Sequence, residues 1–219
     1  MTRRLRYHVA VSLDGFIAGP HGEYDWIVAD PSIDFGALYK EYDTVVMGRK
    51  TYDAAAAAGG GGAMPGLDVY VFSRTLTPAA RKGFHIVNDD AVRFVAALKS
   101  KPGGDIWLFG GGELFRSLLD AGLVDTVEVA VMPVLLSDGV PLLPAGAATK
   151  LVLADQKVLP ASGIIALSYS VAGAHGSAPP IRYIRARKPR RKARAKSRAR
   201  SKPASRAAKR TNTKTRRRR

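Results

Sequence analysis

Three groups of residues in this 219-residue chain directly follow short apolar runs. Together they contain glycines, arginines and residues with a hydroxyl side chain. Glycine lets the backbone approach a ligand closely, and arginine offers a planar, permanently charged set of donors. A hydroxyl adds a further donor, and this combination favours a phosphate or another anion. In chain order the groups are Gly48, Arg49 and Thr51; Ser73 and Arg74; and Gly110, Gly111 and Gly112.

The apolar runs before these groups have the composition of β-strands. Short segments rich in β-branched and aromatic residues predict strands at 5–12, 44–48, 68–73 and 105–111. Cap and turn signals predict helices at 32–41, directly after Gly48, at 89–99 with Asn88 or Asp89 as N-cap, and at 112–121 closed by Gly122. Three further strand-like segments without intervening helices follow at 126–136, 150–159 and 163–172.

This order of elements predicts an α/β fold. Alternating strands and helices favour a mixed, mainly parallel sheet of about eight strands, with helices on both faces and antiparallel strands at its C-terminal edge. The carboxyl ends of parallel strands form a ligand crevice, so the three groups should converge there.

The three groups also have simpler interpretations: the triple glycine can be only a tight turn, and Arg49 can be only the solvated start of a helix. Arg49 and Arg74 would suit the extra phosphate that distinguishes NADP from NAD.

The net charge of +17 is concentrated at the C-terminus. Residues 182–219 contain 20 Lys/Arg and no Asp/Glu, whereas residues 1–181 contain 15 basic and 18 acidic residues, a net charge of −3. The small residues and prolines of 172–181 are typical of a linker. We therefore expect a folded domain at 1–171, the linker, and a disordered basic tail at 182–219.

Composition also excludes several classes of protein. The chain has no cysteine, so disulfides, thiolate metal sites and cysteine nucleophiles are excluded, and its four histidines lack metal-ligand spacing. We therefore expect no metal site. No segment reaches the roughly 18 to 20 apolar residues of a membrane span, and the N-terminal segment turns polar at Asp14, which favours a cytoplasmic protein.

Five ordered motifs resemble the dihydrofolate reductase-like superfamily, most closely the branch that contains the reductase half of the bifunctional riboflavin-biosynthesis deaminase-reductase. The motifs are "SLDGFIAG", "DTVVMGRKTYD", "VYVFSRTL", "DIWLFGGGELFRSLLDAGLVD" and "MPVLLSDGVPLLP". The resemblance covers about residues 3–171. It implies a three-layer α/β/α reductase that uses NADPH.

The resemblance also implies roles for individual residues. Gly48, Arg49 and Thr51 would hold the cofactor phosphates, and Ser73 and Arg74 would meet the adenosine ribose and its phosphate. The pyrophosphate would lie against Gly110, Gly111, Gly112, Glu113 and Leu114. Ala10 and Ile17 would flank the nicotinamide.

The chemistry implied is hydride transfer to a small heterocycle, pterin-like or ribosylamino-pyrimidine-like, as in 5-amino-6-(5-phosphoribosylamino)uracil reductases. Such a site needs an acid, and the candidates are Asp34, Asp25 and Asp30. Asp34 can instead cap the N-terminus of the helix at 32–41. Trp26 can stack on a planar substrate or simply pack against the fold. Asp34 and Trp26 are our candidate catalytic residues. One departure is Ala130, which stands where folate reductases place a threonine.

Other functions stay open. The tail would bind DNA or RNA electrostatically, which gives the alternative of a nucleic-acid-binding protein on a reused reductase scaffold. It could equally bind other acidic surfaces or have no selected role. A further alternative is a cofactor-binding scaffold that has lost turnover. The apolar C-terminal strands would suit a homodimer.

Overall fold

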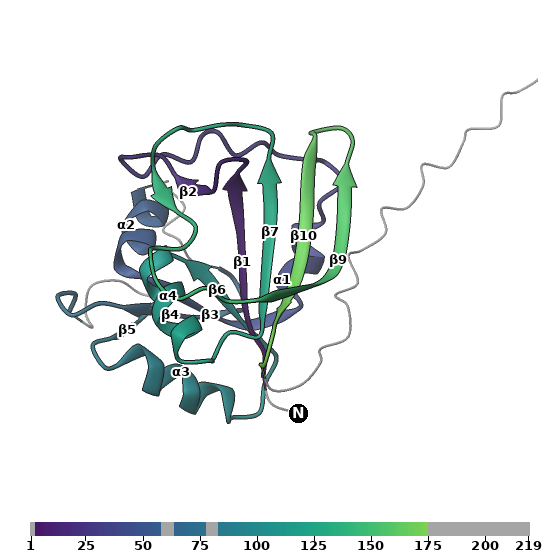
Figure 1. Cartoon of the computed structure of the whole chain (residues 1–219). Coiled ribbons are helices and arrows are strands. Elements are labelled where there is room, and N and C mark those ends of the chain that lie inside the picture. Colours follow the sequence, from purple (N-terminus) through teal and green to yellow (C-terminus); the bar gives the residue numbers. More distant parts are fainter. Residues whose placement is uncertain (1–2, 58–63, 78–82, 175–219) are drawn as a thin grey trace, which may run out of the picture. The chain divides into compact units, whose positions relative to one another are not determined.

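A computed structural model describes residues 3–57, 64–77 and 83–174 (Figure 1). An eight-stranded sheet has the strand order β5-β4-β3-β6-β1-β7-β10-β9. Its strands are β1 (Leu5–Ser12), β3 (Tyr42–Gly48), β4 (Asp68–Phe72), β5 (His85–Val87), β6 (Asp105–Gly110), β7 (Thr126–Met132), β9 (Leu151–Leu159) and β10 (Ile164–Val171). The described helices are α1 (Phe35–Tyr39), α2 (Arg49–Ala57), α3 (Ala91–Lys99) and α4 (Gly112–Asp120).

The sheet is mixed and mainly parallel. Every pairing from β5 across to β7 is parallel, and β10 pairs antiparallel with both β7 and β9. β1 lies between β6 and β7 in the middle of the sheet (Figure 1). The predicted fold class, a parallel sheet extended by antiparallel C-terminal strands, is confirmed.

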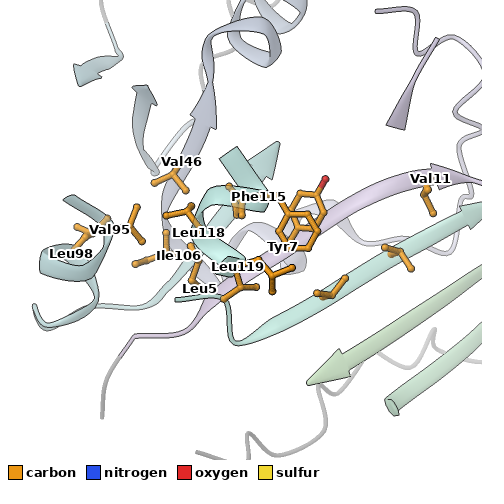
Figure 2. Close-up of a cluster of buried hydrophobic side chains, with 14 residues drawn as sticks. Leu5, Tyr7, Val11, Val46, Val95, Leu98, Ile106, Phe115, Leu118 and Leu119 are labelled. Atoms are coloured by element: carbon orange, nitrogen blue, oxygen red, sulfur yellow. The ribbon is translucent and has the colours of Figure 1, made fainter. Parts of the chain in front are cut away.

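One face of the sheet is covered by α3 and α4. Val95 and Leu98 of α3 and Phe115 of α4 belong to the same buried cluster as Leu5 and Tyr7 of β1 (Figure 2). The rings of Tyr7 and Phe115 stack with their centroids 3.7 Å apart. Each large apolar side chain buried in this way contributes about 1.5–3 kcal/mol through removal from water.

The opposite face is covered by α1 and α2. Tyr52 of α2 is buried with Val45, Met47 and Trp107 of the sheet, and Leu38 of α1 packs against the same cluster. Helices therefore lie on both faces, as predicted. The three-layer arrangement leaves the carboxyl ends of the parallel strands at one edge of the sheet.

Some boundaries differ from the sequence predictions. Helix α3 is capped by Asp90, whose side chain accepts a hydrogen bond from the Arg93 amide at 2.8 Å, so the prediction of Asn88 or Asp89 as N-cap was wrong. Asp89 instead pairs with the Arg93 side chain. Strand β5 and the small pair of β2 (Phe16–Ala18) with β8 (Val140–Pro141) were not predicted, because two or three residues show no clear periodicity.

The edge strand β9 and its neighbour β10 keep apolar side chains in solvent. Val152, Val158 and Ile165 are 60%, 64% and 43% exposed. A homodimer that covers this face stays a prediction. The predicted tail at 182–219 and most of the linker lie outside the described residues. Within the described ranges, no helix is both long and apolar enough to cross a membrane.

Candidate functional site

The three groups that follow the apolar runs lie side by side. In the parallel register Gly48 pairs with Phe72, the residue before Ser73, and Met47 pairs with Gly110. Adjacent strands are about 4.8 Å apart, so the ends of β4, β3 and β6 form one continuous edge. The predicted convergence of the three groups is therefore present in the fold.

Thr51 brings the first and third groups into contact. A Cβ atom added at Gly110 or at Gly111 would lie 3.3 Å from the Thr51 Oγ1 atom, and one added at Gly48 would lie 3.9 Å from the Gly111 nitrogen. Gly110 also has φ of +145°, a conformation that side-chain-bearing residues rarely adopt. The Gly110–Gly111 peptide bond is cis. The positive φ therefore favours glycine at Gly110, and at both Gly110 and Gly111 a side chain would crowd the Thr51 hydroxyl.

Helix α4 begins at this corner with unpaired backbone donors. Its N-cap is Gly111, which has no side chain to bond the first amides of the helix. Such an end presents N–H groups and the positive end of the helix dipole. Glu113 is exposed and Leu114 packs against the core, whereas Gly112 is buried, where an added Cβ would lie 2.9 Å from the Pro141 carbonyl oxygen. Gly112 therefore has a packing role as well.

The two arginines differ in their contacts. The Arg49 Nε atom pairs with the Asp53 carboxylate at 2.7 Å, and Nη1 donates to Thr75 Oγ1 at 3.2 Å, so Arg49 links α2 to the loop after β4. Arg74 lies in that loop, is exposed, and pairs with no carboxylate among the described residues. Arg74 is therefore the guanidinium that a ligand phosphate could engage without displacing an existing ion pair.

Ser73 shapes the loop that carries Arg74. Its hydroxyl accepts hydrogen bonds from the amides of Thr75 at 3.3 Å and Leu76 at 3.1 Å, and its own amide donates to the Val87 carbonyl. Asn88 closes the loop by donating to the Ser73 carbonyl at 2.5 Å. These bonds hold the turn in place, so Ser73 supports the loop in addition to the ligand contact implied by the sequence.

A second region of the site opens where β1 and β6 separate. β1 pairs with β6 only from Leu5 to Tyr7, but it continues to pair with β7 as far as Ser12. Ala10 lies beyond the point of separation. It packs in a cluster with Trp26 and Ile33 of the segment that crosses this face of the sheet. The cluster gives the region an apolar wall.

The loop from β1 to β2 is hydrogen-bonded to the segment that follows β7. The Asp14 carboxylate accepts hydrogen bonds from the Ser12 hydroxyl and from the amides of Leu136 and Ser137, and these bonds lower the pKa of Asp14. Ile17 follows in β2 and packs against the main core. Asp14 thus anchors two loops to each other.

The two candidate catalytic residues are held by local contacts. The Trp26 Nε1 atom donates to the Glu23 carbonyl at 3.0 Å, and its ring packs in the cluster with Ala10. Asp34 is the N-cap of α1, and its Oδ1 atom accepts from the Ala37 amide at 3.0 Å. The capping role considered for Asp34 is therefore present, and its contact with a substrate stays a prediction.

The other candidate acids are no better placed. Asp25 is exposed. Asp30 is buried and accepts hydrogen bonds from Ser162 and Ser32, which lower its pKa to about 2. An acid with so low a pKa is ionised at neutral pH and is a poor proton donor.

We expect Asp34→Ala to separate capping from catalysis. Loss of the cap should reduce the free energy of unfolding by about 1 kcal/mol, and Asp34→Asn, which keeps a capping acceptor, should recover most of it. Chemical denaturation of both variants measures this difference. If Asp34 also contacts substrate, Asp34→Ala and Asp34→Asn should lose turnover equally. If instead turnover falls only in the variant that is less stable, a catalytic role of Asp34 is contradicted.

A buried charged cluster lies on the same face, and sequence reasoning missed it. Arg6 forms a two-pronged pair with Glu128, with Nε–Oε1 and Nη2–Oε2 distances of 2.8 and 2.7 Å, and both side chains are 1% exposed. Glu41 also accepts from Arg6 at 2.7 Å. Burial alone would raise the pKa of Glu128, but the Arg6 guanidinium lowers it below its ordinary value. The signal available in the sequence was a charged residue inside each of two apolar strands.

One pocket formed by described residues lies away from the three strand-end groups. It has a volume of about 310 Å³ and lies between α4 and the segment 142–151, where Phe115, Leu119 and Leu142 line it. Its walls carry mostly apolar and backbone groups. It shares no residue with the three strand-end groups. Within the described ranges, no three His, Asp or Glu side chains lie close enough to one another to hold a metal ion.

Comparison with protein families decides the classification. The family model of the RibD C-terminal domain matches residues 3–162. The chain belongs to the RibD C-terminal domain family. YyaP of Bacillus subtilis (strain 168) is 36% identical over 151 residues, which cover 64% of this chain and 80% of YyaP. The resemblance inferred from the five motifs is thereby confirmed.

Two solved structures have folds similar to that of this chain. A putative riboflavin biosynthesis protein from Shewanella sp. PV-4 aligns with a TM-score of 0.66 and 26% identity, over 78% of this chain and 99% of that one. Dihydrofolate reductase from Enterococcus faecalis, in complex with NADP(H), aligns with a TM-score of 0.58 and 19% identity, over 77% and 96% of the two chains. The second likeness shows the dihydrofolate reductase-like fold, and the family supports an oxidoreductase.

Proposed function

We propose that this protein is an NADPH-dependent reductase of a small heterocyclic substrate. The observation that carries the proposal is that Gly48, Ser73 and Gly110 end neighbouring strands, where close-approaching backbone, a helix N-terminus and Arg74, which has no carboxylate partner among the described residues, follow one another. Each feature favours phosphate, and a dinucleotide has phosphates at its centre and, in NADPH, at the adenosine end. The NADP(H) bound by the Enterococcus relative of the same fold supports this reading.

The residues present fit such a cofactor. The backbone of Gly110 and Gly111 and the N-terminus of α4 would hold the pyrophosphate, and Thr51 would add a hydroxyl. Arg74 would engage the adenosine 2′-phosphate. The nicotinamide would enter where β1 and β6 separate, beside Ala10, and Ile17 would flank it from β2. When bound, the cofactor supplies a hydride; the chain's residues orient substrate against it and exclude water.

The substrate is proposed to be pterin-like or ribosylamino-pyrimidine-like. Large aromatic side chains lie on this face of the sheet in two places: Trp26 packs with Ala10, and Tyr39 and Phe109 lie against Trp107, opposite Arg6 of β1. Planar heterocycles stack on such walls. The relative from Shewanella is a putative riboflavin biosynthesis protein, which supports a substrate of the riboflavin-biosynthesis type.

Replacement of Arg74 tests the cofactor assignment. In Arg74→Ala, the affinity for NADPH should fall about tenfold or more, because a charge-assisted bond to the 2′-phosphate is lost, while the affinity for NADH stays within about twofold. Isothermal titration of the 219-residue chain with both cofactors measures the change. Arg93→Ala, which removes an exposed arginine on α3, is the matched control.

The basic tail is identical in all three proteins, so its attraction for anions cancels from the comparison. Equal losses of NADPH and NADH affinity in Arg74→Ala would refute this placement of the 2′-phosphate. Absence of binding by either cofactor to the unmodified chain would refute the proposed function itself.

A further inference from the structure

His8 occupies an unusual position on β1. It is the first residue after the pairing between β1 and β6 ends at Tyr7, and it lies on the same face of the strand as Ala10 two residues later. Its Nδ1 atom lies 3.2 Å from the Tyr42 hydroxyl and 3.7 Å from Glu128 Oε2. The Nε2 atom makes no hydrogen bond to any described residue, and the side chain keeps 16% of its surface exposed.

The neighbours of His8 engage its Nδ1 atom. Burial raises the pKa of Tyr42 well above its ordinary range, so its hydroxyl stays protonated, and its oxygen can accept a hydrogen bond from Nδ1. In the imidazolium both nitrogens carry protons, and the Nδ1 proton stays on the ring, between Tyr42 and Glu128, when the Nε2 proton leaves. The side of the ring that faces protein is thus satisfied, and the side that carries the Nε2 proton is left for another partner.

Charged groups from several elements act on the imidazole. Burial lowers the pKa of His8, and Arg6 on the same strand lowers it further, whereas Glu128 on β7 and Glu41 after α1 oppose this shift. The lowered pKa makes the imidazolium a stronger acid. The buried Glu128 carboxylate makes its formation feasible at this depth.

We propose that His8 is the proton donor of the reductase and contacts substrate through Nε2. This inference rests on the proposed function, because it requires the nicotinamide to lie beside Ala10. The substrate class would be a heterocycle with a C=N bond, either in its ring or in an attached ribosylamine that has opened to its imine, and the carbon of that bond accepts the hydride. As that carbon gains a hydride, the electrons of the opened double bond pass to nitrogen, which takes the Nε2 proton; solvent then reprotonates the imidazole.

The other titratable groups of this face are already engaged. Asp34 caps α1, and Asp30 is held ionised by two serine hydroxyls. Glu128 is surrounded by Arg6 and Thr126. Among the described groups considered for the acid, His8 alone combines a position beside the β1 and β6 separation with a nitrogen that has no protein partner.

Histidine NMR titration tests the position of His8 without knowledge of the substrate. The nicotinamide ring is positively charged in NADP⁺ and neutral in NADPH, so the pKa of His8 should be lower in the NADP⁺ complex than in the NADPH complex. The exposed His85 on β5 is the control, and its NMR signals should be the same in both complexes. Equal values for His8 in the two complexes, with binding demonstrated for each, would overturn the inference.

Turnover then tests the role of proton donor. His8→Gln should lower kcat about a hundredfold and abolish the fall in rate that the unmodified protein shows as pH rises, whereas His85→Gln should change neither. The probes are dihydrofolate and 5-amino-6-(5-phosphoribosylamino)uracil, with NADPH oxidation as the readout. An unchanged pH profile in His8→Gln, or NADPH binding without reduction of either probe, would overturn the assignment of His8 alone. Failure to bind NADPH would overturn the proposed function and the inference together.

Discussion

Arg6→Met should destabilise the protein by about 3–5 kcal/mol. Arg6 and Glu128 are both 1% exposed and share two hydrogen bonds in the middle of the sheet. Methionine has a similar length but no charge, so Glu128 would stay buried without its partner. Most of the lost stability would come from the Glu128 carboxylate, which would be buried without a partner. The loss of the ion pair itself contributes less, because the free energy gained by a buried pair is largely offset by the desolvation of its two charges.

Arg93→Met is the matched control for this substitution. Arg93 also pairs with a carboxylate, that of Asp89 one helical turn away, but both side chains are more than half exposed. Removal of such a pair should change stability by less than about 1 kcal/mol. Chemical denaturation of the two variants measures the difference. Similar values for both would show that the buried cluster is not the source of stability described here.

Acid should partly rescue the Arg6→Met variant. Without Arg6, burial should raise the pKa of Glu128 above its unfolded value, so the folded state prefers the protonated acid. The destabilisation is then present above the folded-state pKa and is relieved as pH falls through it. The Arg6→Met, Glu128→Gln double variant, which has no buried charge at either position, should recover part of the loss at neutral pH.

Gly110→Ala should weaken NADPH binding about a hundredfold. The added Cβ would lie 3.3 Å from Thr51 Oγ1, so the Thr51 side chain must shift by a few tenths of an ångström, and the φ of +145° strains the backbone of any residue with a side chain. Both effects act on the backbone and the hydroxyl that would hold the pyrophosphate. Because such a change would weaken several hydrogen bonds to the pyrophosphate at once, the expected loss of NADPH affinity exceeds that from the removal of one hydrogen bond.

The control for Gly110→Ala is Gly122→Ala. Gly122 also has a positive φ, of +68°, but an added Cβ would have no atom within 4 Å, and the residue lies beyond the opposite end of α4. This variant should lose some stability and keep its NADPH affinity. Fluorescence titration of both variants, after circular dichroism shows that they are folded, gives the comparison. Normal binding by folded Gly110→Ala would contradict the placement of the pyrophosphate.

The strand ends could be predicted from sequence because two local signals coincide at each of them. An apolar run followed by glycine or serine marks the end of a strand, and at two of the three ends the arginine that follows, Arg49 or Arg74, also indicates the chemistry there. The convergence of the three groups could also be predicted, because parallel pairing places the carboxyl ends of neighbouring strands at the same end of the sheet. The neighbours of each strand could not be predicted, since β6 pairs with β3 and β1 although each is distant from it in sequence.

The buried cluster shows where sequence reasoning fails. Arg6 and Glu128 are 122 residues apart, and they meet because β1 and β7 are adjacent in the sheet. In the sequence each is a single charge in an apolar strand, with no indication of its partner. Asp34 shows the converse, because its capping role follows from nearby residues alone and was anticipated. Local chemistry was therefore predictable, and contacts set by strand order were not.

The most direct test is an NMR titration of the isotopically labelled protein with NADPH, followed at the backbone amides of Gly48, Ser73 and Gly111. These residues end three different strands and should report one ligand. We expect all three signals to shift along the titration with a single dissociation constant, while the amide of Gly122 stays unchanged. Shifts confined to one strand end, or different dissociation constants at the three, would contradict a shared dinucleotide site.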